Sequence, residues 1–423
     1  MQTPLTEEDA EVYVAAVCFK TGPPGKVGVE VERTVHLETD STVQVPVSQV
    51  REAVQLAGTQ LPGGGVITFE PGGQLEISSA CAEDLPGVIE ATRRDLAFTA
   101  GLLEDAGLRF GDLALDPLRS PQRTLDHPRY AAMEQQFNRT GSAGRTMMCS
   151  TASLQVSLDA GSPGTGPLSA YHRWRHLHSL APLLTAMFAN SPFVNGRPSG
   201  WRSARQAAWL AIDSTRTTAP VCFADDPRQD WARYALDAKV LCIRPDDDGG
   251  TWLTPRDLTM RDWLRGAGPR AVTREDLDYH LTTLFPPVRP RGFLEVRVID
   301  AQAGGDWEVV AAVVVALVED PQAAALAAEA CRDLPSLRIA ARDGLSDPSL
   351  AQAALTCADA VWDALPRLGV DPETRARVAT FIERYAARGR SPADACLAEW
   401  RRTGHMPMFA QGAWKEPLHD HHS

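Results

Sequence analysis

Polar and apolar residues alternate in four segments of the chain, and this period of two predicts β-strands. The four segments are residues 27–32, 68–78, 151–159 and 293–300. In an extended strand, residues i and i+2 point to the same face. Each segment therefore has one apolar face, which can pack on a core, and one polar face.

The polar residues of three of these segments are mainly carboxylates. In chain order they are Glu30 and Glu32; Glu70, Gln74, Glu76 and Ser78; and Glu295, Arg297 and Asp300. The remaining segment has Thr151, Ser153, Gln155, Ser157 and Asp159 on its polar face. The sequence Pro71-Gly72-Gly73 predicts a turn directly after Glu70.

Exposure of each polar face to water is the simplest explanation for any one strand. Four such strands favour another explanation, because carboxylates dominate three of the faces and Lys is absent from all four segments. Like charges packed side by side need a counter-charge. Mg²⁺ together with bound phosphates is a usual partner of carboxylates. The pattern therefore predicts a sheet whose concave face holds metal and a polyphosphate.

Helical periodicity fills most of the remaining chain, and Thr6 is the expected N-cap of the first helix. The predicted helices span residues 6–19, 47–57, 84–106, 167–189 and 273–285, then 306–333, 350–367, 371–388 and 391–402. Helices of irregular length between the strands favour an α+β fold with an antiparallel sheet and flanking helices. We expect a catalytic core over 1–300, a helical C-terminal region over 301–415 packed on it, and a disordered tail over 416–423.

The composition is typical of a large soluble enzyme. The 423 residues are 44% hydrophobic, and the net charge of -12 argues against nucleic acid or an anionic membrane as a partner. The longest apolar run, 309–318, is shorter than the ~20 residues that span a bilayer. The acidic N-terminus does not resemble a signal peptide, and the eight cysteines include no C-x-x-C pair. A cytoplasmic protein with reduced cysteines is expected.

Two basic segments carry other candidate chemistry. Arg202 and Arg205 follow a loop rich in Pro and Gly, and arginines in such a place can bind carboxylate or phosphate in a bidentate manner. Surface salt bridges are the alternative. His172 and His176 share a helical face, but the arginines beside them favour a solvated basic face over a zinc site.

Several blocks, in this order, resemble the glutamate-cysteine ligases of the plant and actinobacterial type. The blocks are Val27 to Glu32, Phe69 to Glu76, Met147 to Val156, Ala189-Asn190-Ser191-Pro192-Phe193, Gly200 to Trp209 and Leu294-Glu295-Val296-Arg297. The resemblance covers about residues 20–300. It is closer to the actinobacterial members, which supply γ-glutamylcysteine for ergothioneine synthesis.

The resemblance implies a fold similar to the catalytic part of glutamine synthetase, in which an antiparallel sheet forms a funnel for Mg²⁺ and ATP. It also implies a reaction. The γ-carboxylate of L-glutamate attacks the γ-phosphate of ATP, and the amine of L-cysteine then displaces phosphate from the acyl phosphate. The expected partners are these small molecules, with two or more Mg²⁺ ions.

Roles follow for individual residues. The expected metal ligands are Glu30, Glu32, Glu70, Glu76 and Glu295. Arg297 is expected to hold the transferring phosphoryl group, with Gln74 also on the nucleotide, and Arg205 to clamp a glutamate carboxylate. Thr151 and Gln155 are expected to orient the amino acid, and Trp201 and Arg202 to line its entrance.

Two alternatives remain open at this point. The first is a ligase of the same fold that joins glutamate to a different amine, because only the acceptor pocket would differ. The second is a non-catalytic protein that keeps the fold and binds glutamate or a nucleotide. The presence of all the candidate carboxylates makes the second less favoured. The sequence does not indicate an oligomeric state, and a monomer is one expectation.

Overall fold

A six-stranded antiparallel sheet forms the centre of the molecule in the computed structural model, which describes residues 5–22, 25–55, 60–221, 226–245 and 252–409. The strand order is β3-β4-β1-β6-β10-β9. The strands are β1 (Val27–Arg33), β3 (Val66–Phe69), β4 (Leu75–Ser78), β6 (Ser153–Asp159), β9 (Val288–Pro290) and β10 (Phe293–Asp300). Every neighbouring pair is antiparallel, so the predicted antiparallel α+β fold is confirmed.

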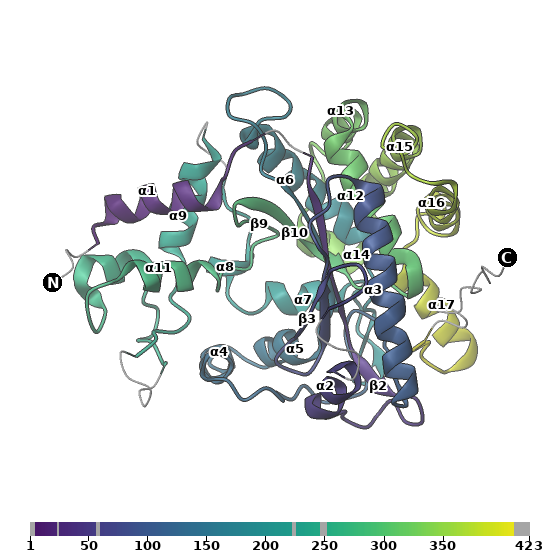
Figure 1. Cartoon of the computed structure of the whole chain (residues 1–423), viewed down its shortest axis with the longest axis horizontal. Helices are drawn as coiled ribbons and strands as arrows, with labels where there is room; N and C mark the ends of the chain where they lie inside the picture. The colour runs from purple at the N-terminus through teal and green to yellow at the C-terminus, as the bar shows by residue number, and fades with distance from the viewer. Residues whose placement is uncertain (1–4, 23–24, 56–59, 222–225, 246–251, 410–423) are drawn as a thin grey trace.

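Helices cover one face of this sheet. In β1, Val27, Val29 and Val31 are buried and alternate with the half-buried Glu30 and Glu32. Helices α3 (Leu85–Asp105) and α12 (Trp307–Glu319) contact β1 on this side, and α6 (Ala170–Met187) contacts β9 and β10 (Figure 1). The opposite face carries most of the polar residues of the strands, among them Glu30, Glu32, Glu76 and Glu295. We call it the acidic face.

The other helices surround this core. In the first half of the chain they are α1 (Glu7–Cys18), α2 (Val47–Gln55), α4 (Pro128–Asn138), α5 (Ala143–Ser150), α7 (Ala204–Leu210), α8 (Ser214–Thr217) and α9 (Pro227–Asp237). Later come α10 (Met260–Asp262), α11 (Arg274–Leu281), α13 (Pro321–Ala330), α14 (Leu337–Asp343), α15 (Pro348–Ala364), α16 (Pro372–Arg384) and α17 (Pro392–Thr403). Two short pairs, β2 (Val35–Leu37) with β5 (Leu108–Phe110) and β7 (Phe193–Val194) with β8 (Arg197–Pro198), complete the fold.

The helices after the last strand share the main core with the sheet. Every residue of α12 from Trp307 to Val318 is buried, and its apolar side chains belong to the same hydrophobic cluster as those of β1 and β6. Within the described ranges, no single helix is long and apolar enough to cross a membrane. The 304–319 and 321–330 helices pass that test only as a pair bent by 94°. The predicted tail at 416–423 lies outside the described residues.

Two local expectations have different outcomes. Thr6 caps α1 with its side chain, as predicted, and accepts from the backbone N–H of Asp9. The solvated basic face predicted for His172 and His176 is wrong for His176, which is buried with its Nε2 2.7 Å from the carbonyl oxygen of Leu317. Helix α6 lies between the sheet and the C-terminal helices, so only a narrow stripe of it meets solvent.

Candidate active site

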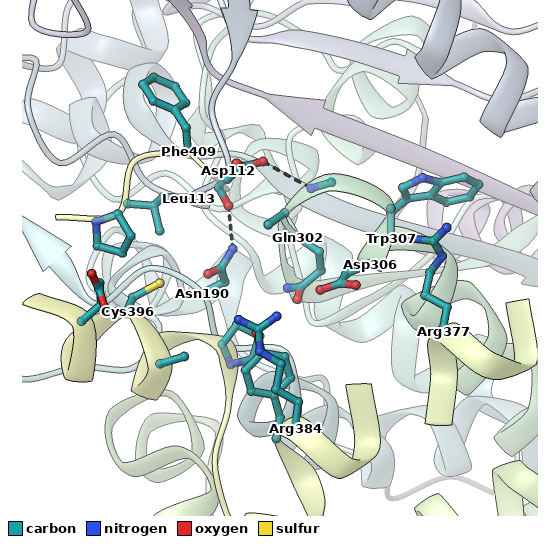
Figure 2. A pocket seen from close by; sticks show the side chains of 18 of the residues that line it. Asp112, Leu113, Asn190, Gln302, Asp306, Trp307, Arg377, Arg384, Cys396 and Phe409 are labelled. Carbon is teal, nitrogen blue, oxygen red and sulfur yellow. Dashed lines mark hydrogen bonds between the residues drawn. The ribbon is translucent and has the colours of Figure 1, made fainter. Parts of the chain in front are cut away.

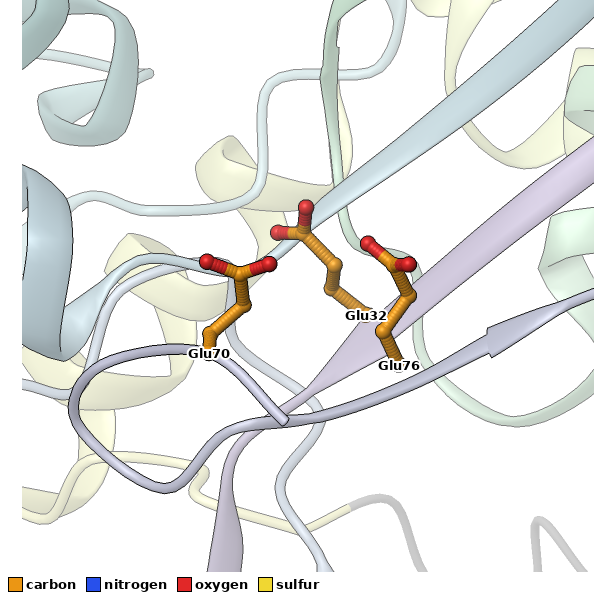
Figure 3. Close-up of side chains that lie close together, drawn as sticks. All are labelled: Glu32, Glu70 and Glu76. Carbon is orange, nitrogen blue, oxygen red and sulfur yellow. The ribbon is translucent and has the colours of Figure 1, made fainter. Parts of the chain in front are cut away.

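Three glutamates come together on the acidic face. Glu32 of β1 stands directly opposite Glu76 of β4 in the strand register, and Glu70 follows the end of β3. One carboxylate oxygen from each lies within 4.8 Å of the others (Figure 3). Alternation within β1 and β4 therefore places these side chains where the sequence predicted them.

A tight turn brings Glu70 into this group. The turn closes with hydrogen bonds from the Gly73 N–H to the Glu70 carbonyl oxygen (2.8 Å) and from the Glu70 N–H to the Gln74 carbonyl oxygen (2.9 Å). Gly73 has φ of +89°, a conformation that side chains disfavour. A Cβ on Gly72 would lie 2.2 Å from the carbonyl oxygen of Cys149, so the turn packs directly on α5.

Neighbouring polar groups fix two of the three carboxylates. Glu32 accepts from the backbone N–H of Ser153 (2.7 Å) and from the side-chain amide of Gln155 (3.1 Å), both on β6. Glu76 accepts from the hydroxyls of Thr68 (2.9 Å) and Ser78 (3.1 Å). These bonds aim each carboxylate before any ligand arrives.

Burial and mutual repulsion raise the pKa values of the carboxylates in this cluster. Desolvation, followed by the charge of Glu32, raises the pKa of Glu70 to about 7 and that of Glu76 to about 7. Glu30 lies next to them on β1, and burial, then Glu295 and Glu76, raise its pKa to about 8. Carboxylates held this close favour a cation between them.

The donor set fits Mg²⁺. Hard carboxylate oxygens are the ligands that this ion takes, usually one or two per ion with phosphate and water completing the shell. Glu32, Glu70 and Glu76 each offer one such oxygen, and these oxygens lie within 4.8 Å of one another, close enough to bind one ion. Glu30 is close enough to feel the same charges and extends the acidic surface toward β10.

An arginine cluster adjoins the glutamates. Glu295 on β10 is fully buried and accepts from Arg289 at 2.7 and 3.1 Å, from Arg297 at 2.7 Å and from Arg291 at 3.3 Å. Burial alone would raise its pKa, but Arg289 and then Arg297 hold the pKa of Glu295 far below its usual range. Glu295 therefore stays ionised and holds the arginines in place.

This arrangement does not fit the prediction of Glu295 as a metal ligand. Both of its oxygens accept from arginines, whose positive charges disfavour a cation at the same position. Three of the other predicted ligands form the compact group, and Glu30 adjoins it.

Gln155 joins the two clusters. Its amide donates to Glu32, while its carbonyl oxygen accepts from Nη1 of Arg297. The rings of Trp209 and Phe285 lie 5.7 and 6.0 Å from the Arg297 guanidinium. The site thus places a positioned cation directly beside a carboxylate group, as phosphoryl transfer requires.

A bulge in β10 shapes the cationic side of the site. The pairing of β10 with β6 shifts register between Val296 and Ile299, so the Arg297 carbonyl is free of the ladder. It accepts from Nη2 of Arg205 at 2.8 Å. Arg205 is buried, and its Nε and Nη1 have no hydrogen-bond partner among the described residues. Bulges of this kind often re-aim side chains at active sites.

Asp300, at the end of β10, anchors two of the sequence blocks. It accepts from the Asn190 N–H (2.8 Å) and from the hydroxyls of Ser191 (2.7 Å) and Ser203 (2.8 Å). Nη1 of Arg205 lies 3.6 Å from it. The Ala-Asn-Ser-Pro-Phe block and the arginine loop therefore meet at one buried carboxylate.

Other predicted site residues have structural contacts instead. The Gln74 amide donates to the carbonyl oxygens of Thr151 and Met148, and its own oxygen accepts from Gly72, so its side chain is not available to a nucleotide. The Thr151 hydroxyl, directly after α5, donates to the carbonyl oxygen of Met147.

The loop residues before α7 also differ from expectation. Arg202 donates to Asp394 of α17 at 2.6 Å, so it ties the loop to the C-terminal region rather than facing the acidic face. Trp201 is half-buried in the same loop, with its N–H on the Ser199 hydroxyl.

Arg289 and Asp300 are site residues that the sequence did not assign. Arg289 lies on β9, the edge strand, where flanking prolines are tolerated because one edge needs no ladder partner. The short Val-Arg-Pro-Arg run was the available signal. Asp300 shares no simple period with Glu295 because the bulge lies between them.

Sequence comparison relates the chain to known proteins. The model of the family described as glutamate-cysteine ligase family 2 (GCS2) matches residues 26–421. The chain belongs to this family. This membership confirms the resemblance that the sequence motifs indicated. The protein is therefore an enzyme of the ligase class.

Two mycobacterial relatives support this membership. The glutamate-cysteine ligase EgtA of Mycobacterium tuberculosis is 40% identical over 363 residues, which are 84% of this chain and 82% of that protein. EgtA of Mycolicibacterium smegmatis is 39% identical over 399 residues, which are 92% and 90% of the two chains. The chloroplastic glutamate-cysteine ligase of Brassica juncea is 31% identical, over 72% of this chain and 61% of that one.

A solved structure shares the fold of this family member. The glutamate-cysteine ligase of Francisella tularensis in complex with AMP aligns with a TM-score of 0.54 and 14% sequence identity. The alignment covers 90% of this chain and 86% of that one. At this identity the likeness concerns the fold alone.

Proposed function

We propose that the protein joins the γ-carboxylate of L-glutamate to the amine of L-cysteine at the expense of ATP. The observation that carries the proposal is the contact of Gln155 with both Glu32 and Arg297, which places a group of carboxylates beside a positioned guanidinium. Family membership supports glutamate and cysteine as substrates.

The carboxylates would hold the nucleotide through ions. Glu32, Glu70 and Glu76, with Glu30 beside them, would bind Mg²⁺ through their deprotonated oxygens. Bound Mg²⁺ supplies neutralisation of phosphate charge and alignment of the γ-phosphate. In both chemical steps, the one that releases ADP and the one that releases phosphate, the chain itself acts mainly by positioning the reacting groups.

Arg297 stabilises the transferred phosphoryl group. A γ-carboxylate oxygen of glutamate attacks the γ-phosphorus, the bond to the ADP oxygen breaks, and the negative charge that shifts onto ADP and the transferring oxygens lies near Arg297. Glu295, with Arg289 behind it, holds Arg297 in this orientation. Trp209 and Phe285 flank the guanidinium and exclude water from it.

Arg205 orients the amino acid. Its Nε and Nη1, which have no hydrogen-bond partner among the described residues, suit a carboxylate of glutamate, next to the position at which Arg297 acts. The cysteine amine then attacks the acyl carbon, the bond to phosphate oxygen breaks, and the amine loses a proton as the amide forms. The free phosphate or solvent takes this proton.

The relatives favour ergothioneine synthesis as the use of the product, and the free thiols of the described cysteines suit the cytoplasm. Ligation of glutamate to another amine is the second candidate. The acidic and cationic clusters would serve it equally well.

Mass spectrometry of the products tests the proposal. Purified protein with ATP, Mg²⁺, glutamate and cysteine is expected to yield γ-glutamylcysteine and ADP, with little ADP when cysteine is omitted. ADP with a different ligation product would keep the mechanism and change the acceptor. The absence of ADP under every condition would favour a binding protein.

A further inference from the structure

A large cavity lies on the helical side of the sheet, away from the acidic face. It has a volume of about 2100 Å³ and lies between α3, the segment that leads from β10 into α12, and the α16–α17 region (Figure 2). Small-molecule sites usually occupy ~300–1,000 Å³. The cavity therefore has room for a metabolite, and the proposed reaction makes no use of it.

Arginines that form no ion pair with a described residue line one end of this cavity, although the charge of Arg384 acts on the nearby Asp306. Arg384, Arg388 and Arg390, at the end of α16 and in the connection to α17, form no ion pair within the described parts of the chain. Other lining arginines are already neutralised, since Arg93 pairs with the buried Glu308 and Arg402 with Glu399. A positive region on a chain with a net charge of -12 favours a negative ligand.

The inner end of the cavity is polar and buried. Asn190 and Gln302 lie there with Asp112 and Asp306, and Figure 2 shows the Arg384 side chain directed toward them from α16. Gln302 is fully buried, and its Oε1 has no hydrogen-bond partner in the residues that the structure describes. Because this oxygen has almost no accessible surface, Gln302 shapes the wall of the cavity and offers no contact to a ligand.

Arg33 adds an unsatisfied cation behind the same wall. Its side chain leaves β1 on the face opposite to Glu32, is 1% exposed, and reaches the carbonyl oxygen of the lining residue Gly304 at 3.5 Å. Its Nε and Nη1 have no partner among the residues described. A buried guanidinium with free donors is costly unless an anion compensates it, and Asp112 and Asp306 do so only at a distance.

We propose that this cavity is a second ligand site, which takes a small molecule with two acidic groups, carboxylate or phosphate. Arg384 and Arg388, which are exposed and line the cavity, bind the acidic groups. The sheet separates this site from the acidic face, which repels anions when no Mg²⁺ is bound.

Calorimetric titration of the whole protein in EDTA tests this site, because removal of Mg²⁺ leaves the acidic face unable to hold phosphates. Pyrophosphate and citrate are the probes, and they distinguish a phosphate ligand from a carboxylate ligand. We expect one molecule of at least one probe to bind per chain. The double variant Arg384→Gln/Arg388→Gln is expected to weaken that binding at least tenfold.

Two controls define the location. Arg401→Gln removes an exposed arginine of α17 that does not line the cavity, and it is expected to leave the affinity unchanged. Glu32→Gln alters only the acidic face and is also expected to have no effect. The proposal is overturned if neither probe binds, if the double variant binds as tightly as the natural chain, or if Arg401→Gln weakens binding equally.

Discussion

Glu32 and Glu76 face each other directly across β1 and β4, so two carboxylates stand side by side on the acidic face. Like charges in directly opposite positions destabilise a sheet. The pair is also partly buried, which strengthens the repulsion because the local dielectric is lower than that of water. The chain thus keeps an arrangement that costs stability until a cation is bound, which is the behaviour expected of a metal site.

Replacement of Glu76 by Gln is expected to raise stability and lower activity. Without Mg²⁺ at pH 8, Glu76→Gln is expected to stabilise the fold by up to about 1 kcal/mol, because a cross-strand repulsion is removed. Mg²⁺ should raise the Tm of the natural chain and have less effect on the variant, whose turnover should fall at least 100-fold. Urea unfolding measures the free energy of unfolding, and thermal melts with and without Mg²⁺ measure the change in Tm.

The matched control is Glu83→Gln, which removes an exposed carboxylate near Lys26. It should change neither the free energy of unfolding nor the rise in Tm with Mg²⁺. If Glu76→Gln lowered stability without Mg²⁺ and kept the response to Mg²⁺, the assignment of this group as a metal site would be wrong.

The raised pKa values of Glu30, Glu70 and Glu76 predict proton release when Mg²⁺ binds. Burial and mutual repulsion raise these pKa values from 4.5 to about 8, 7 and 7, so the folded chain holds protons that the unfolded chain has lost. Their contribution to stability without metal is fully present below pH 4.5 and is lost as the pH rises through 7 to 8.

Calorimetry at pH 6.5 in buffers of different ionisation enthalpy measures this linkage. We expect Mg²⁺ binding to release protons at pH 6.5, to tighten as the pH rises, and to release almost none at pH 9.5, where the carboxylates are already ionised. A binding enthalpy that is independent of the buffer at pH 6.5 would contradict the prediction.

The acidic face was predictable because strand geometry is local. A period of two fixes the side of the sheet on which Glu30, Glu32 and Glu76 lie, whichever strands become neighbours. The turn after Glu70 was equally visible in Pro71-Gly72-Gly73. These features needed no knowledge of tertiary contacts.

The cationic side of the site was not predictable, because it depends on which strands pair. Arg289 reaches Glu295 only because β9 pairs with β10. Residue type alone also did not separate a ligand-binding amide from a structural one. Gln74 and Gln155 both lie on the polar face of a predicted strand, yet Gln74 holds backbone carbonyls and Gln155 joins the two clusters.

Arg289→Met tests the support of Arg297. The variant removes one of the arginines that bind Glu295, and the freed carboxylate is expected to draw Arg297 away from Gln155. We expect kcat to fall 10- to 100-fold with a smaller change in the KM for glutamate. Arg291→Gln is the control, since Arg291 is half-exposed and lies farther from Glu295, at 3.3 Å. Equal losses in both variants would contradict a specific role for Arg289.

Asp300→Ala tests the junction of the two sequence blocks. The substitution leaves the Asn190 N–H and the hydroxyls of Ser191 and Ser203 without their shared acceptor, and Arg205 without its nearest carboxylate. Loss of one partner of such a buried network costs ~3–5 kcal/mol. Denaturant unfolding measures this loss, and Asp343→Ala, at an exposed ion pair on α14, should cost far less. Similar values for the two variants would show that Asp300 is not an anchor.

The turn that positions Glu70 provides a backbone test of the same site. In Gly72→Ala the new Cβ would lie 2.2 Å from the Cys149 carbonyl oxygen, so the turn must move and carry Glu70 away from Glu32. We expect a loss of ~1–3 kcal/mol in stability and weaker Mg²⁺ binding. Gly101→Ala meets no atom within 4 Å inside α3 and should instead stabilise the fold by ~0.5–1 kcal/mol, with Mg²⁺ affinity unchanged. Unaltered Mg²⁺ affinity in Gly72→Ala would mean that Glu70 is not a ligand, because the displacement of its carboxylate follows directly from the close contact of the turn with α5.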